Sequence, residues 1–278
     1  MVKLNETINV ILNRVSLRKY DERHINDEEL ELILDCAIRA PTAGNNMLYS
    51  IILIKDIDTK EKLSVSCDNQ PFIKNADIIM IFLADVKKLY DYFEISKVKE
   101  FCKTYNIPYV RPNFQMLYLA LNDALIAAQN AVIAAESLGI GSCYIGDIVE
   151  RFEYHKQLLN LPENVFIATM LCFGYYPKDY KKKLRPRFDK KYIVHNEKYN
   201  IIKSEELMKI YEIYESQFFE NKTKDLENST NSINSTSLVK NGFNFSNYGQ
   251  FLYKNKFASN FAIEMERSLK EMLKNWFK

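Results

Sequence analysis

The sequence predicts an α+β fold, with a doubly wound α/β sheet as the second possibility. Helical and strand-like segments alternate along the 278 residues without a regular βαβ rhythm. The 47% hydrophobic and 27% charged residues are typical of a globular protein. At this length folding buries roughly 75% of the surface that the unfolded chain exposes, so the core needs no disulfide or metal support.

The first two helices are predicted from apolar residues at helical spacing. One covers residues 5–15. The second, over 26–40, begins with Asn26 and Glu29 in a capping-box arrangement and ends before Pro41. Both ends of this second helix are therefore marked in the sequence.

A long helix is predicted at the centre of the domain. Residues 113–138 combine an apolar stripe with an alanine-rich flank, which favours close packing, and Gly139 is its predicted C-cap. Two further helical patterns cover 151–160 and 203–218.

Three apolar runs predict buried strands. They are Ser50–Lys55, Asp77–Ala84 and Phe166–Phe173. Residues 139–147 (GIGSCYIGD) do not form a dinucleotide-binding fingerprint, because the glycine spacing is wrong and a helix precedes them instead of a strand. We interpret this segment as a glycine-bearing turn that brings main-chain N–H groups close to a ligand.

The C-terminal part of the chain changes character. Residues 220–242 are rich in Asn, Ser, Thr and Lys, which predicts a polar linker or exposed loop between a domain over 1–219 and an arm over 243–278. The arm carries an amphipathic helix, which we expect to dock on a partner subunit, with its own subunit as the alternative. The apolar stripe consists of Phe261, Met265, Leu269, Met272, Leu273 and Trp276.

Charge and cysteine content exclude several classes of protein. Lys plus Arg is 38 and Asp plus Glu is 36, so a nucleic-acid binder relying on bulk charge is not expected. The five cysteines form no C-x-x-C pair, which indicates reduced thiols and a cytoplasmic location. The N-terminal residues lack a signal-peptide core, and no apolar run approaches the ~20 residues that span a bilayer. The three scattered histidines predict no metal site.

Two basic segments are candidate anion sites. If the chain leaves the first helix near Val15 and runs extended, Arg14, Ser16 and Arg18 point to one side and can clamp a dianion. The alternative is a helix end whose basic residues offset the helix dipole. In Lys181–Arg187 alternate basic residues share a face, although a solvated charge run explains the same pattern.

Taken together, these segments resemble the FMN-dependent nitroreductase family, in its NAD(P)H nitroreductase and flavin reductase branch. The similar motifs are R-x-S-x-R at 14–18, APTAGNN at 40–46, C-x-x-Q at 67–70, YIGD at 144–147 and RPR at 185–187. They occur in the family's order over about residues 5–200. Departures are Met47, Leu48 and Tyr49 in place of Gln-Pro-Trp, and Arg185 in place of Lys.

The resemblance implies a nitroreductase-like three-layer sandwich, with a mixed, mainly antiparallel sheet around a long central helix. It also implies an interlocked homodimer with FMN at the subunit interface. Arg14, Ser16, Arg185 and Arg187 would hold the FMN phosphate. Arg18 would lie near the N1 and C2-carbonyl edge of the flavin ring.

Other flavin contacts follow from the same resemblance. Gln70 would hydrogen-bond the ring edge, and the main chain around Ile145 and Gly146 would approach N5. Thr42 and Asn45 would come from the other subunit. The expected set is completed by Tyr144 and Asp147.

The implied reaction is a ping-pong hydride transfer from NADH or NADPH through FMN to a small acceptor such as a nitroaromatic, a quinone or a flavin. No protein side chain is assigned as catalytic, since the flavin carries the chemistry. The alternatives are a dehalogenase-like member of the same fold and a non-catalytic FMN-binding protein. An RNA-interaction protein is a third, with the basic run and Asn-rich tail in its favour.

Overall fold

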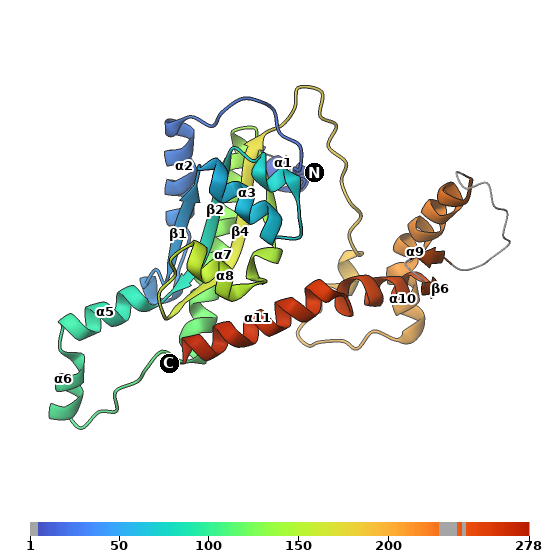
Figure 1. The fold of residues 1–278 in the computed structure, drawn as a ribbon. Helices are drawn as coiled ribbons and strands as arrows, with labels where there is room; N and C mark the ends of the chain where they lie inside the picture. The colour runs from blue at the N-terminus through green and yellow to red at the C-terminus, as the bar shows by residue number, and fades with distance from the viewer. Residues whose placement is uncertain (1–4, 228–237, 241–242, 278) are drawn as a thin grey trace. The chain divides into compact units, whose positions relative to one another are not determined.

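The computed structural model describes residues 5–227, 238–240 and 243–277, and the chain divides into two compact units (Figure 1). One comprises Met1–Leu184 together with Glu264–Lys278, and the other comprises Arg185–Ile263. The predicted domains 1–219, 220–242 and 243–278 divide the chain at other points, and they stay a prediction.

The first unit is built on a four-stranded sheet in the order β1-β2-β4-β3, and all of its strand pairs are antiparallel. A parallel bridge between Ser16 and Ser142 extends the β3 edge. Strand β2 is buried along its whole length, which explains its continuous apolar run. The strands are β1 (Tyr49–Ile54), β2 (Ile78–Asp85), β3 (Ile140–Ile145) and β4 (Val165–Tyr175).

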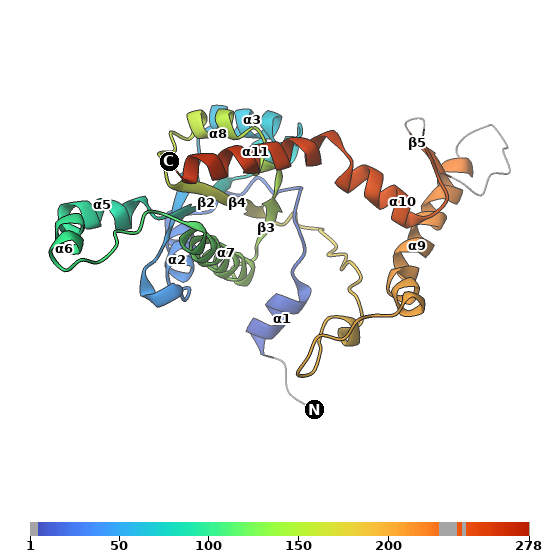
Figure 2. The same cartoon turned by 90° about the horizontal axis from the view of Figure 1, so that it is seen from below.

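Helices cover both faces of this sheet, which confirms the predicted three-layer fold class (Figure 2). On one face lie α2 (Asp27–Ile38) and the long α7 (Phe114–Ser137), with α1 (Glu6–Asn13) beside α7. On the other lie α3 (Ile57–Ser66), α4 (Pro71–Lys74) and α8 (Phe152–Leu158). The fold therefore places a separate hydrophobic cluster on each side of the sheet.

Helix α7 packs closely because its buried face is made of alanines. Ala120, Ala124, Ala127 and Ala131 are fully buried, and neighbouring large residues of the sheet fill the layer. Among the described helices α7 is the one long and apolar enough to cross a bilayer. Its alanine face packs against the sheet, as in the core helix of a folded domain.

Local signals in the sequence mark α2 and α7 correctly. The N–H of Glu29 donates to Asn26 Oδ1 at 2.9 Å and the N–H of Asn26 donates to Glu29 Oε2 at 3.0 Å, so the capping box forms. Asn113 caps α7 through the Met116 N–H, and Gly139 follows with a φ of 76°. These contacts confirm the predicted boundaries.

The interpretation of 139–147 as a turn was wrong. Residues 140–145 form β3, and the turn is confined to its two ends. Ile140, Cys143 and Ile145 are buried and pair with β4, so strand-forming side chains outweigh the glycines. Short η2 (Asp147–Val149) follows the strand.

The remaining helices of the first unit were not predicted. They include α5 (Lys87–Ile95) and α6 (Val98–Thr104). Lys60 interrupts the apolar pattern of α3. This lysine is buried, and its Nζ donates to the carbonyl of Ala76 at 2.8 Å. A buried lysine with a main-chain partner is invisible in a hydrophobicity pattern.

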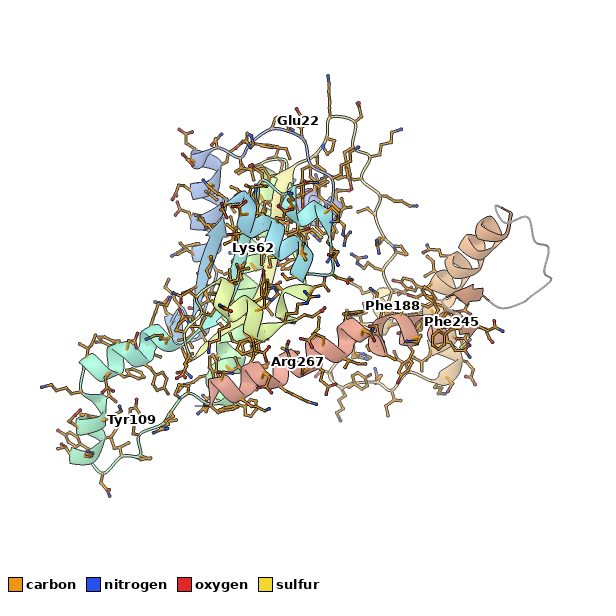
Figure 3. The ribbon with its side chains drawn as sticks, in the orientation of Figure 1. Glu22, Lys62, Tyr109, Phe188, Phe245 and Arg267 are labelled. Carbon is orange, nitrogen blue, oxygen red and sulfur yellow. The ribbon has the colours of Figure 1, made fainter. Side chains whose placement is uncertain are left out.

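The C-terminal helix α11 (Asn260–Trp276) docks on its own chain, which corrects the expectation of docking on a partner. Trp276 is 2% exposed, and its Nε1 donates to the carbonyl of Asn113 at 3.1 Å. Arg267, labelled in Figure 3, donates to both carboxylate oxygens of Glu153 at 2.8 Å. The surface that α11 contacts is formed by residues at the ends of α7, α8 and β4. No local sequence pattern reveals such a surface.

The second unit contains a long helix and an aromatic cluster. Helix α9 (Ser204–Glu227) extends the predicted helix into the expected linker, because 220–227 still contains good helix formers such as Glu, Lys and Leu. The rings of Phe188 and Tyr211 lie 5.3 Å apart, and Phe188 and Phe245 are labelled in Figure 3. The shorter elements are η3 (Lys190–Tyr192), β5 (Leu238–Lys240), β6 (Phe243–Phe245), α10 (Tyr248–Leu252) and η4 (Tyr253–Phe257). Residues 228–237 and 241–242 of the expected linker lie outside the described residues.

Candidate functional site

The segment after α1 runs extended along the edge of β3. Arg14 has φ −64° and ψ 136°, so the helix ends at Asn13, and the N–H of Leu17 donates to the carbonyl of Ser142 at 2.9 Å. Leu17 is fully buried while Ser16 and Arg18 are exposed, as expected for alternating side chains on an extended chain. The extended alternative for this segment is therefore confirmed.

A glycine on β3 makes this pairing possible. A Cβ on Gly141 would lie 2.5 Å from Leu17 Cδ2 and 2.8 Å from Tyr176 Cζ, which is too close for any side chain. The N-terminal segment can therefore approach the strand only because residue 141 is glycine.

Positive charge gathers around this edge. Arg14 Nη2 donates to Ser16 Oγ at 3.4 Å, and the Arg18 guanidinium lies 5.7 Å from the centre of the Phe72 ring. Burial raises the pKa of the Cys143 thiol, while Arg18 and Arg14 oppose that rise. Arg14 Nε is buried without a hydrogen-bond partner, so this donor is free to bind an anionic ligand.

Gln70 and Asp147, which are far apart in the sequence, are brought together. After α3 the chain turns through Asp68 and Asn69, whose φ values of 63° and 51° are left-handed. Gln70 Nε2 then donates to the carbonyl of Cys67 at 2.9 Å and to Asp147 Oδ2 at 2.6 Å. The tight turn and the carboxylate together fix the orientation of the Gln70 amide.

At the end of β3, Tyr144 and Ile145, two residues expected to contact the flavin, have side chains on opposite faces of the sheet. Tyr144 points toward α7, where its hydroxyl donates to Gln129 Oε1 at 3.2 Å, and burial raises its pKa to about 12. Ile145 is buried on the opposite face, and Gly146 is exposed. Of these three residues, Gly146 is the one whose main chain is exposed.

A carboxyl group that the sequence did not single out lies just beyond this turn. Glu150 is buried, and its Oε1 has no hydrogen-bond partner. Burial, reinforced by the charges of Asp147, Asp68 and Glu264, raises its pKa to about 7. The group therefore titrates near neutral pH.

Thr42 and Asn45 lie on the loop between α2 and β1, which includes η1 (Ala43–Asn45). Thr42 Oγ1 accepts a hydrogen bond from the Met47 N–H at 3.3 Å. The Asn45 side chain is exposed, and its backbone is left-handed with a φ of 57°. The loop thus presents Asn45 outward.

Arg185 and Arg187 belong to the second unit, whereas Arg14 and Ser16 belong to the first. Arg187 Nη1 donates to the carbonyls of Arg185 and Pro186, each at 3.2 Å. Within the first unit, Lys182 pairs with the buried carboxylate of Glu136, an ion pair that the sequence did not indicate.

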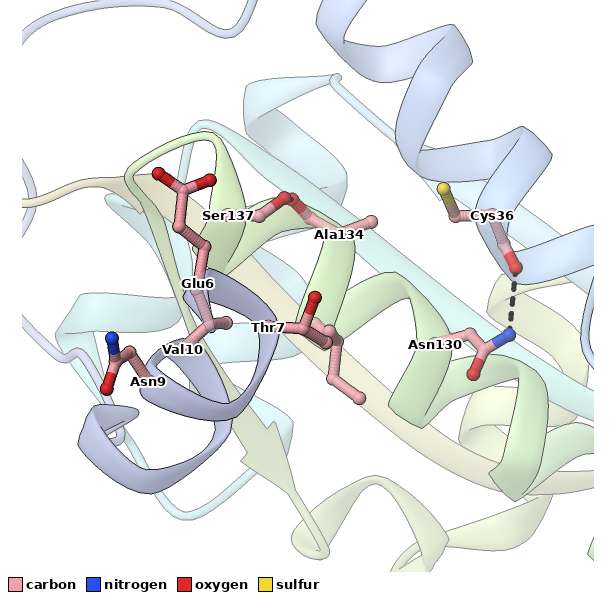
Figure 4. Close-up of a pocket in the computed structure, with 9 residues that line it drawn as sticks. Glu6, Thr7, Asn9, Val10, Cys36, Asn130, Ala134 and Ser137 are labelled. Carbon is pink, nitrogen blue, oxygen red and sulfur yellow. Dashed lines mark hydrogen bonds between the residues drawn. The ribbon is translucent and has the colours of Figure 1, made fainter. Parts of the chain in front are cut away.

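A pocket of about 640 Å³ lies between α1, α2 and α7 (Figure 4). On its wall, Asn130 Nδ2 donates to the carbonyl of Cys36 at 3.1 Å. None of the residues expected to contact FMN lines it. The candidate site is therefore the charged edge at β3 and not this pocket.

Comparison with known proteins shows the family of this chain. A model of the nitroreductase family matches residues 11–175. The chain belongs to the nitroreductase family. The chain is 33% identical over 198 residues to an FMN reductase (NADPH) of Bacillus subtilis, covering 71% of this chain and 76% of the relative.

Two further relatives extend the match. An NADPH-flavin oxidoreductase of Vibrio harveyi is 28% identical over 197 residues, covering 70% of this chain and 75% of the relative. The solved structure of NfrA2 from B. megaterium has a TM-score of 0.71 and 28% identity, covering 97% of this chain and 98% of that structure. The nitroreductase fold therefore extends over the whole described chain.

The notable residues of this chain that its sequence did not single out are buried and polar. Asp123 is a lone acidic residue inside the apolar stretch of α7, and that contrast was the available signal. His155 is fully buried and its Nε2 lies 2.8 Å from Ser66 Oγ. No local pattern connects those two residues, which are 89 positions apart.

Proposed function

We propose that this protein is an NAD(P)H-dependent FMN oxidoreductase that reduces small acceptors such as nitroaromatics, quinones or flavins in a ping-pong reaction. Family membership and relatives named as FMN reductase and NADPH-flavin oxidoreductase support FMN as cofactor and a nicotinamide as electron donor. The single observation in the structure that supports it most is the unpartnered, buried Arg14 Nε at the charged β3 edge.

The residues present fit a phosphate-bearing flavin. Arg14 supplies a free donor, and Ser16 and Arg18 are exposed on the same extended segment. Guanidinium groups bind phosphate oxygens through forked donors. We assign Arg14 and Ser16, with Arg185 and Arg187 of the second unit, to the FMN phosphate.

The ring-binding residues are proposed on the same basis. When bound, FMN supplies the two-electron chemistry by accepting a hydride and passing electrons on. Arg18 would lie at the N1 and C2-carbonyl edge, where its positive charge favours the negative charge of the reduced ring. Gln70, held by Asp147, would donate to or accept from the ring edge, and the main chain of Ile145 and Gly146 would face N5.

We further propose a homodimer with FMN at the subunit interface and Thr42 and Asn45 contributed by the partner. Helix α1 supports this, because none of its residues is buried although Ile8, Ile11 and Leu12 line one side of it. An apolar helix face left in water favours association. The five free cysteines are consistent with a reducing, cytoplasmic environment.

The absorbance spectrum of the purified protein tests the proposal. We expect the protein to carry non-covalent FMN, and we expect anaerobic NADH or NADPH to bleach the flavin absorbance. A colourless protein that also fails to take up added FMN would refute the proposal. A yellow protein that neither nucleotide bleaches would instead show a non-catalytic FMN-binding protein.

A further inference from the structure

A buried carboxylate on the central helix joins both ends of the loop after α2. Asp123 lies in the middle of α7 and is 2% exposed. Its Oδ1 accepts a hydrogen bond from the Ala43 N–H at 2.9 Å, and its Oδ2 accepts one from the Leu48 N–H at 3.3 Å. Hydrogen bonds to an ionised acceptor are stronger than neutral ones, so this carboxylate restrains the loop at two points.

The loop between these two points has a strained backbone. Gly44, Asn45 and Met47 have φ values of 58°, 57° and 51°, in the left-handed region. Glycine adopts this region readily and asparagine tolerates it, but a methionine does so at a steric cost. Such a conformation persists only where surrounding contacts hold it.

We propose that Asp123 is a positioning residue for FMN, because it holds loop 42–48 in the strained shape that presents Asn45 to the flavin of the partner subunit. The inference rests on the proposed function, which assigns Thr42 and Asn45 to that flavin. A loop already held in its binding conformation loses little conformational entropy when the ligand binds, which strengthens binding.

A purely structural role for Asp123 would change stability without a specific change in FMN affinity. Asp77 provides the matched control. Asp77 is also a carboxylate that accepts a main-chain hydrogen bond from a distant loop, since its Oδ2 accepts from the Ile25 N–H at 2.6 Å. Ile25 stands at the α2 end of the connection between α1 and α2, seven positions beyond Arg18, the last residue of that connection assigned to FMN. Loss of stability is expected at both positions, but loss of FMN affinity only at Asp123.

The first experiment compares Asp123→Asn with Asp77→Asn. Urea unfolding of the apoproteins measures stability, and quenching of flavin fluorescence measures the dissociation constant of FMN. We expect Asp123→Asn to raise that constant about tenfold or more, since a charge-assisted bond is lost, and Asp77→Asn to leave it within about twofold. Equal changes in both variants, or none in Asp123→Asn, would overturn the positioning role.

Relief of backbone strain gives a second readout that a general loss of stability would not produce. Met47→Gly removes the cost of the left-handed conformation. In the Asp123→Asn background it should recover part of the lost FMN affinity, whereas in the unchanged background it should have little effect. An equal effect of Met47→Gly in both backgrounds would contradict the idea that Asp123 acts against this strain.

Mixed dimers test whether the loop serves the partner's site. In a dimer of one Arg14→Ala subunit and one Asp123→Asn subunit, one site would combine both defects and the other would have none. We expect FMN to bind with unchanged affinity at half the normal stoichiometry. Two equally weakened sites would overturn the action across subunits.

The two proposals fail in distinguishable ways. If the unchanged protein does not bind FMN, or Arg14→Ala does not weaken binding, the proposed function itself is wrong. If Arg14→Ala weakens FMN binding and Asp123→Asn does not, only the positioning role is wrong.

Discussion

The two edges of the central sheet differ in how their buried polar groups are satisfied. At the β1 edge, Ser50 Oγ donates to Asp85 Oδ2 at 2.6 Å, and Asp123 accepts two main-chain hydrogen bonds. At the β3 edge, partners are missing. In the part of the chain that the structure describes, the buried side-chain atoms without a partner are Arg14 Nε, Ser142 Oγ, Glu150 Oε1 and His155 Nδ1.

Ser142 lies on β3, Arg14 lies on the segment that pairs with it and Glu150 lies just beyond the strand, whereas His155 belongs to α8. A buried polar group without a partner costs free energy, so such groups are rare in structural regions and need an explanation where they gather. The contrast supports the proposal that a ligand binds at the β3 edge. Three pairs of substitutions test this contrast, in order of decreasing expected effect.

The largest effect is expected at the Arg14 guanidinium. Arg14→Ala should weaken FMN binding by about 1.5–3 kcal/mol, the contribution of one charge-assisted hydrogen bond. Isothermal titration with FMN measures it. Lys181→Ala serves as the control and should change affinity far less, because its side chain is exposed. Similar small effects at both positions would show that the phosphate site lies elsewhere.

A smaller effect, which depends on pH, is expected at Glu150. Its folded pKa of about 7 lies above the unfolded value of 4.5, so its contribution to stability is full below pH 4.5 and lost as pH rises through 7. Glu150→Gln removes the ionisable group, and with it the loss of stability that accompanies its ionisation. We expect it to raise the free energy of unfolding by roughly 1–2 kcal/mol at pH 8 and little at pH 4.5, as measured by urea unfolding.

Glu153 provides a control of opposite sign for that measurement. Its hydrogen bonds from Arg267 lower its pKa, so its contribution is present at neutral pH and lost as pH falls through the folded pKa. Glu153→Gln should therefore destabilise the protein at pH 8. If Glu150→Gln behaved in the same direction, the carboxyl of Glu150 would have an unrecognised partner.

The smallest effect compares two serines, one at each edge. Ser50→Ala should lower the free energy of unfolding by about 1 kcal/mol because it removes the hydroxyl donor to Asp85 Oδ2 and leaves the Lys87 N–H as the donor to Oδ1. Ser142→Ala removes a buried hydroxyl without a partner and should raise stability by up to about 1 kcal/mol in the apoprotein. Chemical denaturation of both variants measures the difference. Equal losses at the two positions would remove the contrast between the edges.

The sequence predicted the parts of the fold that depend on neighbouring residues. The capping box of Asn26 and Glu29, the buried run of β2 and the alanine face of α7 were all readable, because each is a local pattern. Strand β3 was misread because Gly141 and Gly146 suggested a turn, whereas the long-range contact of Gly141 with Leu17 explains the glycine.

The candidate site was predictable only through ordered motifs. Arg14 and Ser16 were identified by type and spacing and Gln70 by the family resemblance. The structure confirms the extended segment, and it also brings Gln70 to Asp147, which was not predicted. Asp123 and Glu150 were not identified, since their importance comes from partners or missing partners far along the chain. The docking of α11 on its own chain was missed for the same reason.

That docking makes the first unit discontinuous in sequence. Residues 185–263 are inserted between its main body and the segment that begins at Glu264. That segment is held by non-covalent contacts alone, which are made by Trp276, Met272 and the Arg267–Glu153 ion pair. A single cut within the second unit would therefore yield two fragments that remain associated in native conditions and separate only when the first unit unfolds.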